Sequence, residues 1–389
     1  MLFEKNNFQG LDLTLISATI GLVLFGLIMV FSSTTMESFK YGNMFYYLNR
    51  QLIFLAMGIF AFIFAVRTDH KNYGKWSGQI LIASIFLLSL VYVPFLGKSV
   101  NGAVRWIDLG FFSFQPSEFA KLAVVIYMAD VLARKGERIS DFIKGIFPLL
   151  VTVMVICIFI ILQPDLGTVL VILGTVLIML FIAGSQLKHM LGLFAATAAG
   201  VAALSILAPY RMQRLLAFID PWKDPQGISY QIVQSLIAVG SGGLFGLGIG
   251  ASRQKFLYLP QSSTDFIFAI ICEELGLIGA TILIALFFML IKRGIVIARK
   301  TTARFGLLLA SGITASIALQ VIINISVVTG LAPTTGIPLP FISYGGTSLI
   351  ISLFCVGVLV NISKADQSSE VRPVLRSSKD AGGRTKEER

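Results

Sequence analysis

The chain contains 389 residues, of which 56% are hydrophobic and only 13% are charged, and its formal net charge is +11. This composition excludes an ordinary soluble domain, because apolar runs repeatedly reach the length that crosses about 30 Å of hydrocarbon in a bilayer. The Lys and Arg residues are spread over several loops, which favours anchoring to anionic headgroups over binding of nucleic acid. The sequence therefore predicts an all-α polytopic membrane protein.

We predict ten membrane-spanning helices. Their expected ranges are 13–32, 48–66, 78–97, 118–133, 146–162, 168–183, 190–208, 266–291, 305–329 and 347–362. The first run is too long for a signal-peptide core and lacks a cleavage site, so we expect it to be retained. With the N-terminus inside, the short basic loops are cytoplasmic, whereas the external turns 163–167 and 330–346 contain no Lys or Arg. The positive-inside rule therefore predicts that both termini lie in the cytoplasm.

Residues 1–364 are expected to form one integral membrane domain, with a large extracytoplasmic loop at about 209–265 between the seventh and eighth spans. Within this loop, glycines are dense over residues 240–250, which breaks a helix or lets backbones touch. A re-entrant or surface-lying segment is favoured over a phosphate-binding loop, because no strand precedes the glycines and no Lys-Ser or Lys-Thr pair follows them. Residues 365–389 lose the apolar residues, and we expect a disordered cytoplasmic tail.

Several polar clusters fall on the extracytoplasmic side of this topology. They are NGAVRWIDLG at 101–110 with QPSEFAK at 115–121, QPDLGT at 163–168, PLPFISYGGT at 338–347, and Asp265 at the start of the eighth span. Each also has a purely structural interpretation, such as a Pro-initiated helix, an i,i+3 pair of Glu118 with Lys121, or a turn capped by Asp165. Their convergence on one surface favours a functional site there.

Asp265 is the first candidate for chemistry. Ionisable groups at the edge of a span are retained mainly where they face a cavity, a partner charge or a substrate. Thr264 can cap the helix, which leaves the carboxylate of Asp265 free to act as a base. Glu273 and Glu274 lie about two turns deeper, and hydrogen bonding to neighbouring helices is the favoured role for both.

External cations near Asp265 suit an anionic amphipathic substrate whose tail stays in lipid. They are Arg105, Arg211, Arg214, Arg253 and Lys255. Cations of this kind hold diphosphate oxygens, while the carboxylate takes a proton from an attacking hydroxyl. A merely solvated charged surface remains the alternative, because Asp220 and Asp224 share these loops. No zinc-like or calcium-loop spacing is present, so the sequence predicts no protein-held metal.

The motifs resemble the SEDS family of bacterial cell-wall polymerases. They are RWIDLG with QPSEFAKL, QPDLGT at 163–168, TDFIFA at 264–269 followed by Glu273-Glu274-Leu275-Gly276, and PLPFISYGGTS at 338–348. The resemblance extends from the first span to about Lys364. Residues 208–256 and 324–341 are more similar to the FtsW and spore-cortex branch than to the elongation-type RodA branch. One departure is Ser263, where many members have His before the Thr-Asp pair.

This resemblance implies a peptidoglycan glycosyltransferase that polymerises lipid II on the outer face of the bacterial cytoplasmic membrane. It implies that Asp265 is the general base on the acceptor 4-hydroxyl, which displaces the undecaprenyl diphosphate of the nascent glycan strand with inversion. It also implies lower-ranked substrate-binding residues, namely Arg105, Glu118, Lys121, Lys255 and Ser343. A divalent cation, Mg or Mn, that bridges the diphosphate and Asp265 remains open.

The implied partners are a class B penicillin-binding protein, which cross-links the glycan, and other membrane proteins of the division septum. Three alternatives remain at this point. The chain is a lipid II flippase, or it is a non-catalytic scaffold that activates the transpeptidase, or it serves the sporulation cortex or elongation instead of division.

Overall fold

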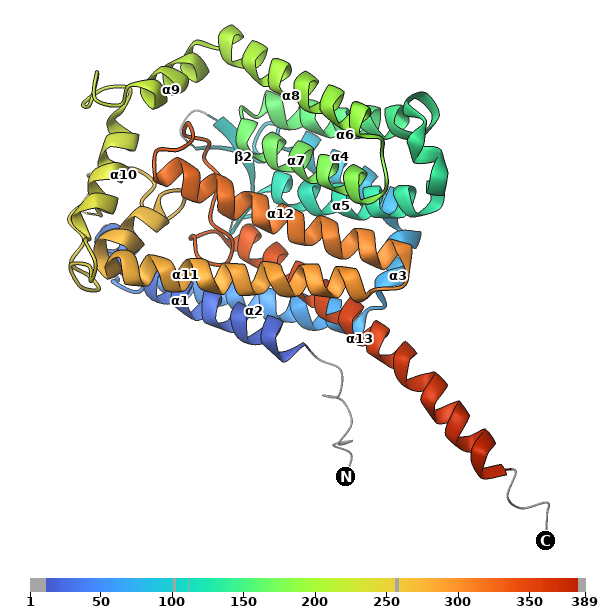
Figure 1. Cartoon of the computed structure of the whole chain (residues 1–389). Coiled ribbons are helices and arrows are strands. Elements are labelled where there is room, and N and C mark those ends of the chain that lie inside the picture. The colour runs from blue at the N-terminus through green and yellow to red at the C-terminus, as the bar shows by residue number, and fades with distance from the viewer. Residues whose placement is uncertain (1–11, 101–102, 111, 256–258, 384–389) are drawn as a thin grey trace.

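The computed structural model describes residues 12–100, 103–110, 112–255 and 259–383, with side chains described as far as Ala365 except at positions 100 and 137. Most of the helices lie side by side along one direction and form a bundle (Figure 1). The first half contains α1 (Leu13–Phe39), α2 (Tyr46–Arg67), α3 (His70–Lys75), α4 (Ser77–Leu90), α5 (Pro116–Lys135), the 3-10 turn η1 (Gly136–Ser140), the π turn η2 (Phe142–Ile146), α6 (Phe147–Leu162) and α7 (Leu166–Ile182). The second half contains α8 (Leu187–Leu207), α9 (Pro209–Ile219), α10 (Tyr230–Ser241), α11 (Ile267–Lys300), α12 (Arg304–Val328) and α13 (Gly346–Gly383).

The helical segments agree with a multi-pass membrane protein. Among the described residues, seven segments are long and apolar enough to cross a bilayer, namely α1, α2, η2 with α6, α8, α11, α12 and residues 346–365 of α13. α4 and α7 are shorter apolar helices, and α5 coincides with the fourth expected span while carrying Glu118 and Lys121. Each of the ten expected ranges overlaps one helix, and the count of ten crossings stays a prediction.

The third expected span was wrong at its outer end. We expected it to reach residue 97, but α4 ends at Leu90 and a small antiparallel sheet follows. The sheet contains β1 (Gly97–Val100), β2 (Ala103–Asp108) and β3 (Ser113–Phe114), with Gly97 opposite Ile107 and Ile107 opposite Phe114. A side chain at position 97 would collide with the carbonyl of Val91. β1 therefore packs closely against the residues that follow α4, and the RWIDLG motif begins on β2.

α12 lies at the centre of the bundle, where it contacts α5, α7 and α11. Its most apolar window is 67% buried, whereas α8 has no buried residue. α13 packs along α2 and then leaves the bundle (Figure 1). An isolated polar helix without tertiary contacts is only marginally stable in water, and the expected disorder of residues 365–389 stays a prediction.

The glycine-rich segment touches the backbone of α11, as expected from its composition. α11 is broken at Gly276, whose φ of +64° favours glycine. The broken turn is filled by backbone hydrogen bonds from Leu247 N to Glu273 O (2.9 Å), Gly248 N to Glu274 O (2.9 Å), Leu277 N to Gly243 O (2.9 Å) and Ile278 N to Leu244 O (3.2 Å). These bonds satisfy polar groups that a break at membrane depth would otherwise leave unpaired.

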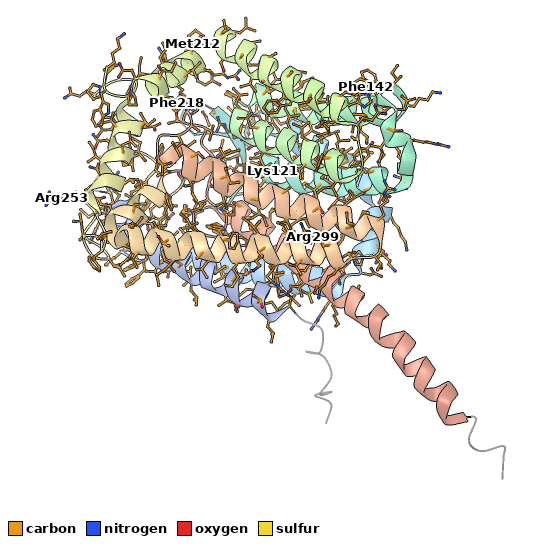
Figure 2. All side chains as sticks on the ribbon, in the orientation of Figure 1. Lys121, Phe142, Met212, Phe218, Arg253 and Arg299 are labelled. Carbon is orange, nitrogen blue, oxygen red and sulfur yellow. The ribbon has the colours of Figure 1, made fainter. Side chains whose placement is uncertain are left out.

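The ion-paired and carbonyl-bound arginines of the expected cytoplasmic loops lie at the opposite end of the bundle from the polar motifs. At one end, Arg293 pairs with the buried Asp12, and Arg304 donates to the carbonyl of Ala183 (3.1 Å). The polar motifs and Asp265 meet at the other end, and Figure 2 shows Arg253 there and Arg299 toward the basic end. The grouping agrees with an arrangement in which both termini face the cytoplasm.

Candidate active site

Asp265 lies directly before α11 on a fixed backbone. Its carbonyl accepts a hydrogen bond from the side-chain Nδ2 of Asn324 on α12 (2.8 Å), which also donates to the carbonyl of Ile337 (2.8 Å). One buried amide therefore ties the backbone of Asp265 to α12 and to the 333–341 segment. Asp265 as a whole residue is only partly buried.

Burial shifts the carboxyl group of Asp265 toward its neutral form, against the charges of two arginines. Burial raises the pKa of Asp265 to about 6 from its ordinary value, the charge of Arg105 opposes this rise, Asp165 adds to it and Arg214 opposes it. Among the described residues, neither arginine forms a direct ion pair with the carboxylate. A carboxylate that is not consumed by an ion pair and titrates near the working pH suits a general base.

Arg105 is held beside the acid by the turn between α6 and α7. Its Nε donates to the carbonyl of Gln163 (2.9 Å) and its Nη2 donates to the carbonyl of Pro164. The remaining Nη1 points to Gly336, where an added Cβ would lie 3.9 Å from Nη1 and 3.5 Å from Asp265 Oδ2. The structure thus brings Arg105 and Asp265 together beside Gly336.

Asp165 caps α7, as expected from the turn sequence. Its carboxylate accepts from the backbone N (3.1 Å) and the hydroxyl (2.8 Å) of Thr168. The same buried charge also acts on Asp265. The sequence favoured the helix cap for Asp165 and did not anticipate this second effect.

Ser343 fastens the 338–344 loop to the segment that carries Asp265. Its hydroxyl donates to the carbonyl of Thr264 (2.6 Å) and accepts from the backbone N of Leu339 (2.8 Å). The backbone N of Tyr344 adds a bond to the carbonyl of Ser263 (2.9 Å). Ser343 is therefore a support for the acid in this structure, and its expected contact with substrate stays a prediction.

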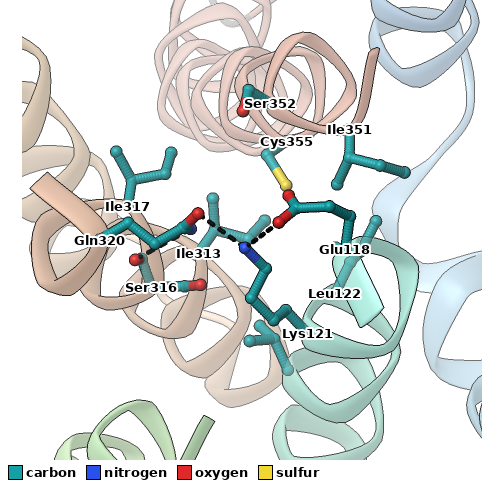
Figure 3. A pocket seen from close by; sticks show the side chains of 11 residues that line it. Glu118, Lys121, Leu122, Ile313, Ser316, Ile317, Gln320, Ile351, Ser352 and Cys355 are labelled. Carbon is teal, nitrogen blue, oxygen red and sulfur yellow. Dashed lines mark hydrogen bonds and ion pairs between the residues drawn. The ribbon is translucent and has the colours of Figure 1, made fainter. Parts of the chain in front are cut away.

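Glu118 and Lys121 form a buried polar cluster with Gln320, which lies outside the sequence motifs (Figure 3). The Nζ of Lys121 lies 2.7 Å from Glu118 Oε1 and 2.6 Å from Gln320 Oε1. A cavity of about 20 Å³ adjoins the cluster, which is room for about one water molecule. Gln320 lies about 6 Å before Asn324 along α12, so the cluster lies one turn below the backbone contact of Asp265.

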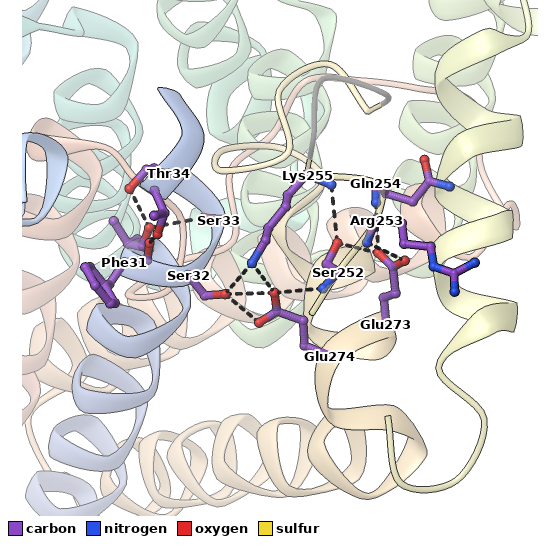
Figure 4. A network of polar contacts seen from close by, with 12 residues as sticks. Phe31, Ser32, Ser33, Thr34, Ser252, Arg253, Gln254, Lys255, Glu273 and Glu274 are labelled. Atoms are coloured by element: carbon purple, nitrogen blue, oxygen red, sulfur yellow. Dashed lines mark hydrogen bonds and ion pairs between the residues drawn. The ribbon is translucent and has the colours of Figure 1, made fainter. Parts of the chain in front are cut away.

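Lys255 belongs to a different network (Figure 4). Its Nζ lies 2.9 Å from Glu274 Oε1 and 3.3 Å from Ser32 Oγ, and the Ser32 hydroxyl donates to both oxygens of Glu274 (2.7 and 2.6 Å). Lys255 is not among the charges that act on Asp265. The structure places it as a bridge between α1, α11 and the external loop, whereas the sequence suggested a substrate contact.

Glu273 fixes the same loop from the neighbouring position. Its carboxylate accepts from the backbone N of Arg253 (3.0 Å) and Gln254 (3.4 Å), and from the hydroxyl of Ser252. The two glutamates therefore lock α11 to its neighbours, which confirms the favoured interpretation. Such interactions explain how two carboxylates persist at this depth.

The site offers little to a metal ion. Within the part of the chain that the structure describes, no group of three or more His, Cys, Asp or Glu side chains is arranged to hold one. Asp265 is flanked by guanidinium groups, which repel a cation, and Asp165 is engaged at its helix cap. The residues present do not fit a protein-held metal, so we derive no step through one.

Comparison with known proteins gives a consistent result. The model of the FtsW, RodA and SpoVE family, described as a cell cycle protein, matches residues 13–368. Stage V sporulation protein E of Bacillus subtilis (strain 168) is 46% identical over 91% of this chain and 97% of its own length. The probable peptidoglycan glycosyltransferase FtsW of Geobacter sp. (strain M18) is 40% identical over 91% of this chain and 97% of its own length.

Solved structures share the fold. A chain of a peptidoglycan synthase complex that coordinates polymerization and crosslinking aligns with a TM-score of 0.77 and 28% identity, over 92% of this chain and 99% of that chain. The rod shape determining protein RodA of Thermus thermophilus aligns with a TM-score of 0.67 and 27% identity, over 92% of this chain and 98% of its own. The chain therefore belongs to the FtsW, RodA and SpoVE family of cell cycle proteins, the family that its external motifs resemble.

Proposed function

We propose that this protein is a peptidoglycan glycosyltransferase that polymerises lipid II at the outer face of the cytoplasmic membrane. The observation that carries the proposal is the carboxylate of Asp265, which lies at the outer end of the bundle, is acted on by the charges of Arg105 and Arg214, and has a pKa of about 6. Relatives named as probable peptidoglycan glycosyltransferases cover nine tenths of the chain, which supports the same reaction class.

The residues suit an inverting displacement. Asp265 takes the proton of the acceptor 4-hydroxyl as the oxygen attacks the anomeric carbon of the lipid-linked strand. The bond from that carbon to the diphosphate oxygen breaks, and the undecaprenyl diphosphate leaves with the electron pair. Arg105 and Arg214 stabilise the negative charge on the leaving group. Because the diphosphate is already a good leaving group, no second carboxylic acid is required, unlike in glycoside hydrolysis.

The supporting residues hold this geometry. Ser343 and Asn324 fix the backbone on both sides of Asp265, and precise placement of a reacting group is worth several orders of magnitude in rate. Glu118 and Lys121 lie one turn deeper with Gln320. Their role in this proposal is to neutralise one another and to keep α5 and α12 in register beneath the site.

The proposed partner is a class B penicillin-binding protein, with other membrane proteins at the division septum. Support comes from the structural match to a chain of a peptidoglycan synthase complex. The 46% identity to a stage V sporulation protein favours synthesis of the spore cortex as the second candidate role. Depletion in dividing and in sporulating cells, with localisation of a fluorescent fusion, separates the two.

The test is incubation of the purified protein with lipid II alone. Formation of glycan strands without any other glycosyltransferase supports the proposal and rules out a scaffold. Transfer of lipid II across a vesicle membrane without formation of strands would instead establish a flippase and overturn the proposal.

A further inference from the structure

A cleft of about 240 Å³ lies between α9, α10 and the 329–337 segment. This volume is below the about 300–1,000 Å³ of pockets that hold drug-sized ligands, so it suits one sugar ring rather than a disaccharide. The polar residues of its lining are Tyr210, Gln213, Arg214, Gln231 and Thr334. No part of the chemistry described above uses Gln213, Gln231 or Tyr210.

The cleft adjoins the proposed catalytic acid. Arg214 lines the cleft, donates from its Nη1 to the carbonyl of Thr334 (3.2 Å), and acts electrostatically on Asp265. Thr334 lies two residues before Gly336, and a Cβ added at Gly336 would lie within 4 Å of both Asp265 Oδ2 and Arg105 Nη1. One wall of the cleft is therefore also part of the surroundings of Asp265.

The lining matches carbohydrate better than phosphate or lipid. Gln213 and Gln231 offer neutral amides that both donate and accept hydrogen bonds, as sugar hydroxyls and acetamido groups require. Phe218 and Ile232 provide apolar surface for the face of a sugar ring. A phosphate group held in the cleft would need more than the single guanidinium of Arg214, and a lipid tail would leave the amides unpaired.

The walls are built before any ligand arrives. The hydroxyl of Ser235 on α10 donates to the carbonyl of Val328 (2.8 Å), which anchors α10 to α12. Asp224 closes the turn between α9 and α10 by accepting from the backbone N of Gly227 (3.1 Å) and Ile228 (3.0 Å). A pre-formed site avoids the cost of ordering its side chains on binding.

We propose that the cleft between α9 and α10 is a subsite for an N-acetylated hexosamine of the growing glycan strand. The proposal rests on the polymerase function and adds the site that holds the strand between couplings. A strand held at one of its own sugars stays near Asp265 after each addition, so the cleft increases the number of additions per binding event. Both the growing strand and incoming lipid II carry acetamido sugars that could occupy the cleft. The experiment below determines which of the two does.

The first measurement uses a ligand that cannot react. Chitotetraose, an unbranched oligomer of N-acetylglucosamine, lacks the diphosphate leaving group, and its binding to the full-length protein is measured by saturation-transfer NMR. Gln231→Met removes one amide from the cleft wall. Gln234→Met is the matched control, because Gln234 lies on the same helix outside the cleft lining. We expect Gln231→Met to weaken binding about 2- to 10-fold, the effect of one neutral hydrogen bond, and Gln234→Met to bind as the wild type does.

The second measurement separates the strand from lipid II. The wild type and both variants are incubated with lipid II, and the rate of the first coupling and the length of the strands are determined. We expect Gln231→Met to give shorter strands at an unchanged rate of first coupling. An equal slowing of first coupling and extension would place incoming lipid II in the cleft and overturn the proposal.

Two further results would also overturn it. One is chitotetraose binding by Gln231→Met at the wild-type level, and the other is binding of a sugar-free stem pentapeptide that depends on Gln231. If the protein binds chitotetraose through Gln231 but makes no glycan from lipid II, the polymerase function fails while the sugar site stands.

Discussion

The ion pair between Lys255 and Glu274 allows a test of whether Lys255 stabilises the fold, as the structure indicates, or contacts substrate, as the sequence suggested. Both side chains are buried, and removing one partner of a buried pair costs about 3–5 kcal/mol of the free energy of unfolding. In Lys255→Met, Glu274 keeps the hydroxyl of Ser32 and a long bond from the backbone N of Ser252 (3.4 Å). We therefore expect Lys255→Met to lose about 3 kcal/mol of the free energy of unfolding, the lower end of that range. Because Tm falls by about 2–4 °C per kcal/mol, this loss corresponds to a fall in Tm of about 6–12 °C.

The assay is thermal unfolding followed with a thiol-reactive dye, because Cys157, Cys272 and Cys355 are all buried and react only when the fold opens. The double variant Lys255→Met with Glu274→Gln removes both charges. We expect its fall in Tm to be smaller than the sum of the falls in the two single variants. If Lys255→Met unfolds at the wild-type temperature but loses polymerisation, Lys255 contacts substrate and our structural interpretation is wrong.

Further predictions concern the acid, the helix break and the tail. The pKa of Asp265 of about 6 predicts that kcat/KM rises about tenfold between pH 5 and pH 7, because the base acts in its deprotonated form. Arg105→Gln removes a charge that lowers this pKa, so the midpoint of the pH profile moves upward, and a downward shift would contradict the assignment. Gly276→Ala is expected to lower Tm, because Gly276 has φ of +64° and contacts the glycine-rich backbone. Gly240→Ala is expected to leave Tm unchanged, because Gly240 has open space around it. Equal Tm values for the two variants would refute this explanation of the helix break. Removal of residues 365–389 is expected to leave the rate of the purified protein within about twofold, because this polar tail is expected on the cytoplasmic side, across the membrane from Asp265, and loss of polymerisation would contradict this.

The sequence predicted well those features that depend on local pattern. Apolar length placed each expected span on a helix, and the distribution of Lys and Arg assigned the ends of the bundle. The convergence of the 101–110 motif with Asp265 followed from this topology alone, and the structure brings Arg105 to the acid. The cap at Asp165 also follows from local chemistry, because an Asp before a helix accepts from nearby backbone N–H groups.

Features that depend on distant partners were not predictable in this way. The local sequence around Lys255 does not show its partners, because Glu274 lies 19 positions later and Ser32 lies 223 positions earlier along the chain. The third span was expected to continue to residue 97, but a small sheet follows α4 there. The apolar pattern does not reveal that β1 pairs with β2. Gln320 and Asn324 were missed, although polar residues four apart in an apolar helix share one face and indicate a buried contact.

The most direct test of the central claim is the rate of lipid II polymerisation by Asp265→Asn. Asp220→Asn is the matched control, because Asp220 is an exposed acid in the same external loop. A general base contributes about 10²–10⁴-fold, so the account predicts at least about a hundredfold loss for Asp265→Asn, at the Tm of the wild type and with Asp220→Asn fully active. Strand synthesis by a correctly folded Asp265→Asn variant at the rate of the control would contradict the account.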